Sequence, residues 1–273
     1  MRLTILGAGT CALSPYRGAS AYWVEAGGLK IRLDSGPGSV HAMARFGLPW
    51  KEVTHQIVSH FHLDHVHDLP ALLFALKYGR PEKRSAPLEI IGPEGTEALV
   101  CGFVDLYRMR FLRQEFPVRF RELDPPAERD LGKGVRLRVA KTPHTPESLA
   151  IRLESGGAAL GYTGDTRPSS ELATFFADVD VLISECSFLD DPRDTPHLTA
   201  DQTADLATAA GAKHLVATHA YFDPEEERLA ERLARRFRGR ITVPRDGETL
   251  DVGAPGASRK RPGRSRRSPR TQV

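Results

Sequence analysis

The chain has 273 residues, of which 40% are hydrophobic and 27% are charged, an ordinary composition that excludes a fibrous repeat and a largely disordered chain. No apolar run reaches the roughly 20 residues that a membrane span needs. The net charge of +3 arises at one end: residues 258–273 hold seven of the 38 basic residues and no acidic one, which leaves 31 basic against 35 acidic residues elsewhere.

Short runs of alternating or continuous apolar residues recur along the chain, bounded by Gly, Pro or Asp, and they predict strands. The runs occupy residues 3–6, 22–26, 29–34, 56–60, 88–92, 135–141, 149–155, 158–164, 180–184 and 214–219. Gly156 and Gly157 separate two of these runs, and such a pair favours a tight hairpin turn.

Helix signals are fewer. Helices are predicted from about residue 68 to 78 and from about 94 to 109. Thr199–Gln202 has the form of a capping box and Gly211 stands where a C-terminal cap belongs, which predicts a helix between them. A further helix is predicted over residues 223–238, with acids in its first turn and arginines near its end. Sheets covered by helices are the expected architecture, with a doubly wound parallel sheet as the alternative.

The first predicted strand is followed by a glycine pattern that resembles a dinucleotide site. Gly7, Gly9 and Ala12 fit G-x-G-x-x-A, and Asp34 ends a later strand where a ribose-binding acid belongs. A dinucleotide site also needs a helix that opens at the glycines to bind the pyrophosphate. Residues 13–18, Leu-Ser-Pro-Tyr-Arg-Gly, do not favour a helix. We therefore expect a tight loop between strands.

Four histidines and two aspartates lie within residues 59–68, directly after a predicted strand. A turn that leaves a strand end can bring several side chains to one point. Neutral imidazoles and carboxylates bind zinc and similar divalent ions, but two such ions need about six or seven protein ligands, more than this cluster supplies. The remaining ligands must therefore come from elsewhere in the chain.

Three further residues stand in equivalent places. His144, Asp165 and His219 each follow a predicted strand. Any one of them alone would be read as an ordinary polar residue, but the three together with the dense cluster predict a metal centre. The three cysteines are odd in number and far apart, so they form neither a disulfide framework nor a C-x-x-C metal site, and they favour a reducing, cytoplasmic location.

With these residues the sequence resembles the metallo-β-lactamase superfamily over nearly everything up to residue 253. The resemblance rests on LTILGAGT at residues 3–10, LDSGPG at 33–38, HFHLDH at 60–65, the single His144, Gly-Asp-Thr at 164–166 and the last His219. It implies an α/β fold, a four-layer αββα sandwich that binds metal along the edge between its sheets. The hydrolase domain would span residues 1–253.

The resemblance also implies a ligand set for two divalent metal ions. Zn²⁺ is expected, with Mn²⁺ or Fe²⁺ as alternatives. His60, His62 and His144 would hold one ion, Asp64, His65 and His219 the other, and Asp165 would bridge the two together with a hydroxide. No cysteine stands at a ligand position, which argues against the antibiotic-hydrolysing branch. Ordinary structural roles are expected for the unmatched residues His41, His55, His67, Asp68 and His214.

Two segments resemble the ribonuclease Z-like subgroup, ISECSF at residues 183–188 and PHLT at 196–199. In that subgroup a histidine at the place of His197 contacts the scissile phosphate and helps to protonate the leaving oxygen, and a glutamate at the place of Glu185 orients it. Asp64, His197 and Glu185 are therefore the candidate catalytic residues. Support of a metal-bound histidine is an equal alternative for Glu185.

One departure from the subgroup concerns the substrate. Ribonuclease Z proteins usually insert a tRNA-gripping arm between the single histidine and the bridging aspartate, but His144 and Asp165 are only 21 positions apart. We therefore expect a phosphodiesterase acting on a small-molecule or nucleotide phosphodiester. RNA 3′ processing, and arylsulfatase, thioester or lactone hydrolysis, are the alternatives. A non-catalytic nucleic-acid binder is disfavoured by the full ligand set, and a homodimer is expected from the resemblance.

The C-terminal end is expected to be a basic, disordered tail over residues 254–273. It is rich in Arg, Pro, Ser and Gly and has no apolar periodicity, so it cannot offset the entropy lost on ordering. Such a tail could bring RNA to the protein, although a solvated tail without a specific role is the preferred interpretation.

Overall fold

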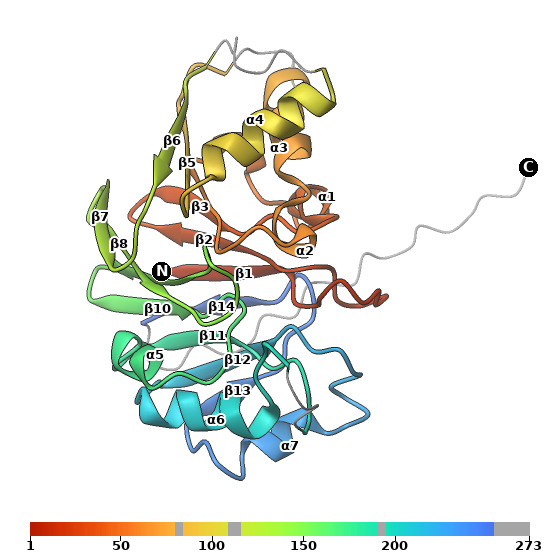
Figure 1. Ribbon diagram of the computed structural model, residues 1–273, viewed down its shortest axis with the longest axis vertical. Coiled ribbons are helices and arrows are strands. Elements are labelled where there is room, and N and C mark those ends of the chain that lie inside the picture. Colours follow the sequence, from red (N-terminus) through yellow and green to blue (C-terminus); the bar gives the residue numbers. More distant parts are fainter. Residues whose placement is uncertain (80–83, 109–115, 191–194, 254–273) are drawn as a thin grey trace, which may run out of the picture.

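The structure is a computed structural model that describes residues 1–79, 84–108, 116–190 and 195–253. Within these residues, two seven-stranded sheets pack face to face, and helices cover the outer face of each (Figure 1). This is the four-layer αββα arrangement that the sequence predicts. The predicted basic tail, residues 254–273, lies outside the described residues. None of the helices in the described ranges has the length and apolar composition needed to cross a membrane.

The first sheet is built from the N-terminal half of the chain and the last strand. Its order is β14 (Thr249–Asp251), β1 (Arg2–Gly7), β2 (Ala21–Ala26), β3 (Leu29–Leu33), β4 (His55–Ile57), β5 (Leu88–Gly92) and β6 (Val118–Glu122). Strands β14 to β3 are antiparallel, whereas β3 to β6 are parallel. Helices α1 (Ser39–Arg45), α3 (Leu69–Tyr78) and α4 (Thr96–Leu106) lie on its outer side.

The second sheet mirrors this plan. Its order is β13 (Arg240–Thr242), β12 (His214–Thr218), β11 (Val181–Glu185), β10 (Ala158–Tyr162), β9 (Leu149–Ser155), β8 (Val135–Lys141) and β7 (Ala127–Gly132). Strands β10 to β13 are parallel and β7 to β10 antiparallel. Helices α5 (Ser170–Phe175), α6 (Ala200–Ala209) and α7 (Leu229–Leu233) cover it.

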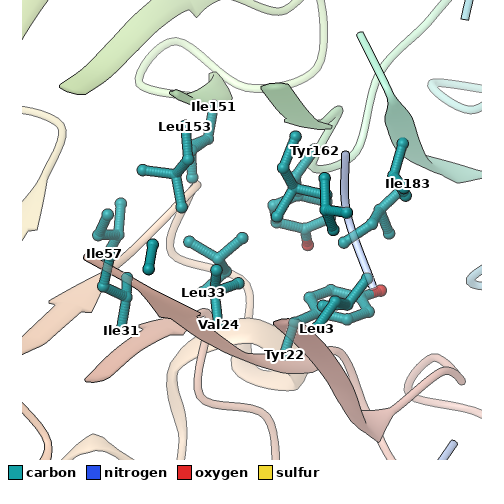
Figure 2. Packing of buried hydrophobic residues seen from close by; sticks show 14 of the residues in the cluster. Leu3, Tyr22, Val24, Ile31, Leu33, Ile57, Ile151, Leu153, Tyr162 and Ile183 are labelled. Carbon is teal, nitrogen blue, oxygen red and sulfur yellow. The ribbon is translucent and has the colours of Figure 1, made fainter. Parts of the chain in front are cut away.

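The core between the sheets follows the two-residue period of the strands. On β2, Tyr22 and Val24 point between the sheets, whereas Trp23 points outward against the helices. Figure 2 shows the inner faces interlocking, with Tyr162 of the second sheet near Tyr22 of the first. Their ring centroids are 5.0 Å apart in an edge-on contact, which ties the sheets together close to the candidate site.

Most predicted elements are present, with one clear correction among the helices. The capping box of Thr199 and Gln202 is formed at the start of α6, and Gly156 and Gly157 take positive φ angles in the hairpin between β9 and β10. The helix predicted from residue 223 begins only at Leu229, because Arg228 has a φ of 53°, a left-handed conformation that a continuous helix excludes.

Two other predictions concern segments near the ends of strands. The glycine-rich segment after β1 contains no helix, so it lacks the helix N-terminus that the dinucleotide pattern requires. Helix α4 ends at Leu106, and residue 109, where the predicted helix was expected to end, lies outside the described residues.

The topology itself gathers the functional residues. The carboxyl ends of neighbouring parallel strands meet at one edge of a sheet, which is where α/β proteins bind ligands. In the second sheet this edge carries the residues that follow β10, end β11 and follow β12, namely Asp165, Glu185 and His219. In the first sheet it carries Asp34 after β3 and His60 after β4.

Candidate metal centre

The histidine cluster lies in a short loop between β4 and the one-turn helix α2 (Leu63–Val66). The loop places Asp64 and His65 in the first turn of α2, with the extended residue His62 immediately before it. His60 and His65 are fully buried, whereas His62 remains open to solvent. The local change from strand to helix thus turns side chains that would alternate along a strand toward a common point.

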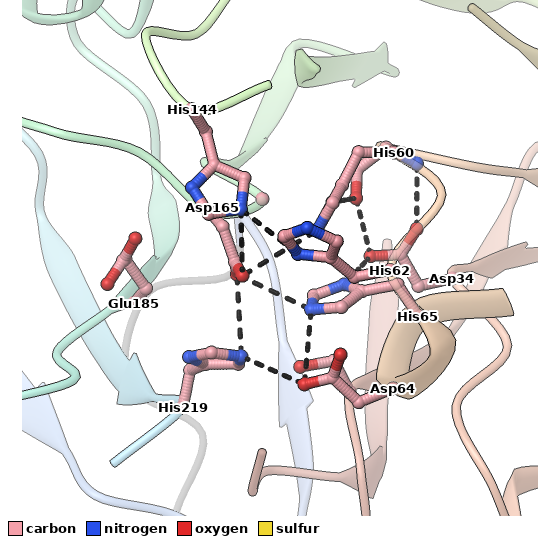
Figure 3. A network of polar contacts seen from close by, with 12 residues as sticks. Asp34, His60, His62, Asp64, His65, His144, Asp165, Glu185 and His219 are labelled. Carbon is pink, nitrogen blue, oxygen red and sulfur yellow. Dashed lines mark hydrogen bonds and ion pairs between the residues drawn. The ribbon is translucent and has the colours of Figure 1, made fainter. Parts of the chain in front are cut away.

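Asp165 lies at the middle of the centre (Figure 3). Its two carboxylate oxygens face different histidines. One oxygen, Oδ2, is 3.6 Å from Nε2 of His60 and 3.6 Å from Nε2 of His144. The other, Oδ1, is 3.4 Å from Nε2 of His65 and 3.5 Å from Nε2 of His219. A carboxylate so placed can be shared between two ions.

The remaining two candidates complete the two groups. His62 Nδ1 is 3.2 Å from His144 Nε2, and Asp64 Oδ2 is 3.4 Å from His219 Nε2. The structure thus brings all seven predicted ligands together in two groups. Within each group, the donor atoms all lie within 4.8 Å of one another. His60, His62, His144 and Asp165 form one group, and Asp64, His65 and His219 the other; a third group of possible ligands joins Asp165 and His219 to His197.

The donor atoms at the middle of the centre fit a metal ion. Nε2 of His60, His65 and His219 is buried in each case and has no hydrogen-bond partner among the described residues. Buried polar atoms without partners are costly and rare in folded proteins. These three nitrogens all point at Asp165, so the arrangement is explained if they bind divalent cations.

The second ring nitrogen of four histidines is held by a partner outside the centre, which fixes the ring orientation. The four pairs are His60 Nδ1 with Ser59 Oγ at 3.0 Å, His65 Nδ1 with Asp34 Oδ2 at 2.7 Å, His144 Nδ1 with Pro196 O at 3.1 Å, and His219 Nδ1 with Ser187 Oγ at 3.0 Å. In each case Nε2 is left to face the centre.

The sequence pointed to Asp34 only as the acid of the rejected dinucleotide pattern and as part of the motif LDSGPG, not as a member of the metal centre. Asp34 is fully buried and accepts hydrogen bonds from the backbone N–H and the hydroxyl of Ser59 at 2.7 and 2.8 Å, and from the hydroxyl of Tyr162 at 2.5 Å. Through His65 it therefore joins the centre to the core between the sheets. The available signal was an acid that ends an apolar strand, Leu-Asp-Ser-Gly, at the same sheet edge.

The charges of the centre reinforce one another. Burial alone would raise the pKa of Asp165, but His219 and His65 hold it well below its usual range. Burial likewise opposes charge on His65, yet the carboxylates of Asp165 and Asp34 raise its pKa well above the ordinary value. Burial lowers the pKa of His60 well below the ordinary value. The carboxylates of Asp165 and Asp34 thus favour positive charge at His65, which either a proton or a divalent cation can supply.

His197 and Glu185 form a pair beside this centre. His197 Nδ1 is 3.1 Å from Glu185 Oε1 and 3.9 Å from Asp165 Oδ2. Burial opposes charge on His197, but the hydrogen bond and charge of Glu185 outweigh it and raise the pKa. Glu185 also accepts hydrogen bonds from Thr166 N and Ser187 Oγ. Glu185 thus orients His197 and, through Ser187, also supports His219.

Three of the unmatched residues have contacts elsewhere in the structure. His55 contacts Glu89 and Thr54, His214 is 2.9 Å from Thr242 Oγ1, and Asp68 accepts a hydrogen bond from Val40 N at the start of α1. Neither these residues nor His41 and His67 belong to a metal-capable group in the described part of the chain.

Residues 30–220 match the family model of the Beta-lactamase superfamily domain. The chain belongs to the beta-lactamase superfamily. The matched region contains every candidate ligand as well as Glu185 and His197. A curated relative, the Ribonuclease Z of Mycobacterium avium (strain 104), is 29% identical over 283 residues, which cover 93% of this chain and 99% of the relative. That alignment is longer than the part of the chain it covers, so the relative carries insertions that this superfamily member lacks.

Solved structures agree on the fold. The metallo-beta-lactamase fold protein YhfI from Bacillus subtilis matches with a TM-score of 0.76 and 23% identity, over 91% of this chain and 98% of that one. Human tRNase Z, short form, matches with a TM-score of 0.75 and 22% identity, over 93% and 100%. The predicted family, its four-layer fold and a hydrolase as the class of enzyme are confirmed.

Proposed function

We propose that the protein is a dinuclear metal-dependent phosphodiesterase whose hydrolase domain spans residues 1–253. The observation that carries the proposal is the position of Asp165, whose two oxygens face two separate groups of ligands, with His197 beside them. Two sites that share a carboxylate suit a pair of ions that act on one substrate. The names of relatives such as Ribonuclease Z point to the same class of bond.

The proposed metals are two Zn²⁺ ions. Nitrogen-rich ligation by five histidines favours zinc over magnesium or calcium, and the carboxylates also accommodate manganese or iron. His60, His62 and His144 would hold one ion, Asp64, His65 and His219 the other, and Asp165 both. Bound there, the ions supply Lewis-acid activation of the phosphodiester and of the attacking water.

The chain's own residues would then direct the proton transfers. His197, with Nδ1 held by Glu185, would present Nε2 to the leaving oxygen and donate a proton to it as general acid. Asp64, which is also a ligand of the second ion, contacts His219 and would hold the proton of the attacking water. Glu185 would act by positioning His197 rather than by touching the substrate.

The surface beside the centre is suited to an anionic substrate. A cavity of ≈ 760 Å³ borders His144 and is lined in part by the basic side chains of Lys141 and Arg167. Both basic side chains are exposed, so their long-range attraction would help to guide a phosphate-bearing molecule toward the histidines. Glu171 on the same wall offsets part of this charge.

The first test is hydrolysis of bis(4-nitrophenyl) phosphate. We expect turnover by the metal-loaded protein, loss of turnover after treatment with a chelator, and recovery when Zn²⁺ or Mn²⁺ is added. A sulfate ester, 4-nitrophenyl sulfate, serves as the matched control, because it shares the leaving group. The proposal is wrong if the metal-loaded protein does not cleave the phosphodiester, or if it cleaves the sulfate ester in preference.

RNA 3′ processing is the second candidate, favoured by the name of the curated relative. Between His144 and Asp165 the chain has only the hairpin of β9 and β10, with no room there for an RNA-gripping arm. We therefore expect small diesters to be cleaved in preference to precursor tRNA. Accurate cleavage of a precursor tRNA by the full chain, lost when residues 254–273 are removed, would reverse this ranking and assign RNA binding to the tail.

Replacing Asp34 with Asn should weaken metal binding. Asn keeps the size of the side chain and tolerates the left-handed φ of 55° at this position, so the fold should be retained. The neutral amide cannot stabilise the imidazole of His65 as the carboxylate does, and loss of such a partner costs about 10- to 100-fold in metal affinity. Competition with a chromogenic chelator measures the change, and unchanged affinity would contradict the role of Asp34.

We further propose that the protein forms a homodimer through the outer face of α2, α3 and α4. Five of the eight exposed large hydrophobic side chains in the described residues lie there, namely Leu63, Phe74, Tyr78, Leu106 and Tyr107. Clustered exposed apolar groups mark interaction surfaces. Sedimentation velocity should report a dimer that Phe74→Glu dissociates and Leu13→Glu, on a distant loop, does not. A monomeric wild-type protein would exclude the dimer.

A further inference from the structure

A second, smaller pocket adjoins the metal centre. It has a volume of ≈ 270 Å³, and its walls are the loop of residues 9–17 and the segment 220–224 that directly follows His219. The backbone N–H of His219 donates to the carbonyl of Ala8 at 2.8 Å, immediately before the first wall. Both walls of this pocket therefore begin within two residues of the His219–Ala8 contact.

The pocket is held open by interactions of its own. The buried guanidinium of Arg17 donates to both carboxylate oxygens of Glu225, at 3.0 and 2.6 Å, and to Pro244 O at 3.0 Å. At the base of the loop, Gly9 N donates to Gly18 O at 2.7 Å, and a Cβ on Gly9 would lie only 2.7 Å from Arg17 O. The glycines after β1 thus help to shape a pocket that is present before any ligand binds. Binding sites for small molecules are generally preformed in this way.

Tyr221 belongs to both the pocket and the metal centre. Its ring lines the pocket, and its centroid is 5.7 Å from that of His219 and 6.1 Å from that of His197. Phe188 stacks on the ring at 5.5 Å and 9°, and the hydroxyl lies 3.5 Å from Cys11 Sγ. The ring is therefore held by Phe188 at one face and by Cys11 at the hydroxyl, while 38% of the side chain stays exposed.

We propose that this pocket binds the nucleobase of a nucleotide substrate whose phosphate lies at the metal centre, with Tyr221 as the stacking surface. The inference deepens the proposed phosphodiesterase function and rests on it. Bases stack on aromatic side chains irrespective of sequence, because every base has a flat π face. The volume is near the lower end of small-ligand pockets, about 300–1,000 Å³, which suits one base rather than a longer segment of nucleic acid.

The polar groups of the pocket favour stacking over recognition of base edges. Ser14 Oγ accepts a hydrogen bond from Tyr16 N, and Asp223 Oδ1 accepts hydrogen bonds from the backbone of the next turn. These side chains already stabilise the loops, so they do not offer a fixed pattern of donors and acceptors to a base. We therefore expect all four bases to bind, with purines favoured by their larger ring surface.

The test compares two ligands that differ only in the base, AMP and ribose 5-phosphate, by isothermal titration calorimetry with the Zn²⁺-loaded full chain. The wild-type protein should bind AMP about tenfold more tightly than ribose 5-phosphate, which is within the range of one base–aromatic stack. Tyr221→Leu should reduce this preference to less than about twofold, whereas Tyr221→Phe should retain it. Tyr16→Leu, on the same loop but outside the pocket lining, should also retain it.

A second variant tests the pocket without changing Tyr221, in case Tyr221→Leu fails to fold. The side chain of Leu13 is fully exposed yet lines the pocket, so Leu13→Ser leaves the fold intact and should lower the AMP preference by about twofold. Equal binding of AMP and ribose 5-phosphate, or a preference untouched by Tyr221→Leu, would overturn the inference. If phenyl phosphate bound as tightly as AMP, the pocket would accept any aryl ester, and the nucleobase assignment would be overturned.

Hydrolysis of bis(4-nitrophenyl) phosphate by the same preparations separates this inference from the proposed function. Turnover combined with equal binding of AMP and ribose 5-phosphate would reject the pocket and keep the phosphodiesterase. A preference for AMP that depends on Tyr221, combined with no turnover of any diester, would keep the pocket and reject the phosphodiesterase.

Discussion

Asp165→Asn is expected to abolish binding of the second metal ion and to lower diester hydrolysis by about a thousandfold or more. Asp165 is the residue whose oxygens face both groups of histidines, at 3.4–3.6 Å, and it is almost fully buried. An amide keeps the shape of the side chain but offers one oxygen and no charge, so it cannot neutralise two cations. The loss should therefore exceed that of any other single ligand.

Metal content by mass spectrometry after gel filtration, together with the rate on bis(4-nitrophenyl) phosphate, measures this effect. Asp178→Asn is the matched control, since Asp178 is exposed and belongs to none of the groups of possible metal ligands among the described residues. A variant that keeps both ions and most of its activity would show that Asp165 does not bridge a metal pair.

His197→Gln should separate general acid catalysis from metal binding. Loss of a general acid lowers rates by about 10²–10⁴-fold when the leaving oxygen needs a proton. The variant should therefore lose activity of that order on thymidylyl-thymidine, whose leaving alcohol is a weak acid. It should lose much less on bis(4-nitrophenyl) phosphate, because 4-nitrophenolate leaves without a proton.

The two substrates make the result specific for His197 as an acid. Metal content should be unchanged, because His197 is held by Glu185 and lies outside the two proposed ligand sets. Glu185→Gln should show a smaller loss with the same substrate pattern, since it disturbs the orientation of His197 rather than removing the ring. An equal loss on both substrates would argue that His197 only binds the substrate or stabilises the site.

The sequence was sufficient to select the seven candidate ligands that the structure brings together, because the fold places them by simple rules. His144, Asp165 and His219 each follow a strand, and these strands run so that their ends meet at one edge. The dense cluster after β4 then had to lie opposite, once two sheets packed face to face. For these residues, the local patterns and the family resemblance therefore led to the same set that the three-dimensional structure brings together.

Other features depend on contacts between distant segments and could not be predicted in the same way. Asp34 is surrounded by Ser59 and His65, which become its neighbours when β4 pairs with β3, and by Tyr162, which reaches it only when the two sheets pack. The strands β13 and β14 have three residues each, too few for a periodic pattern to appear. The helix expected from residue 223 was shortened at Arg228, where a left-handed backbone overrides a favourable charge pattern.

The pocket beside Tyr221 illustrates the same limit. The glycines after β1 gave a false dinucleotide pattern, and their actual role depends on Arg17 reaching Glu225, 208 positions further along the chain. Neither residue carries a local signal for such a pair. Only the packed structure shows that the first loop and the loop after His219 enclose one space.

Titration of the metal-free protein with Zn²⁺, followed by calorimetry and by hydrolysis of bis(4-nitrophenyl) phosphate in the same samples, tests the central claim most directly. A dinuclear phosphodiesterase should bind two ions per chain, and its activity should rise to a plateau at the second equivalent. Binding of one ion or none at saturation, or two bound ions without hydrolysis of any phosphodiester, would contradict the proposed function.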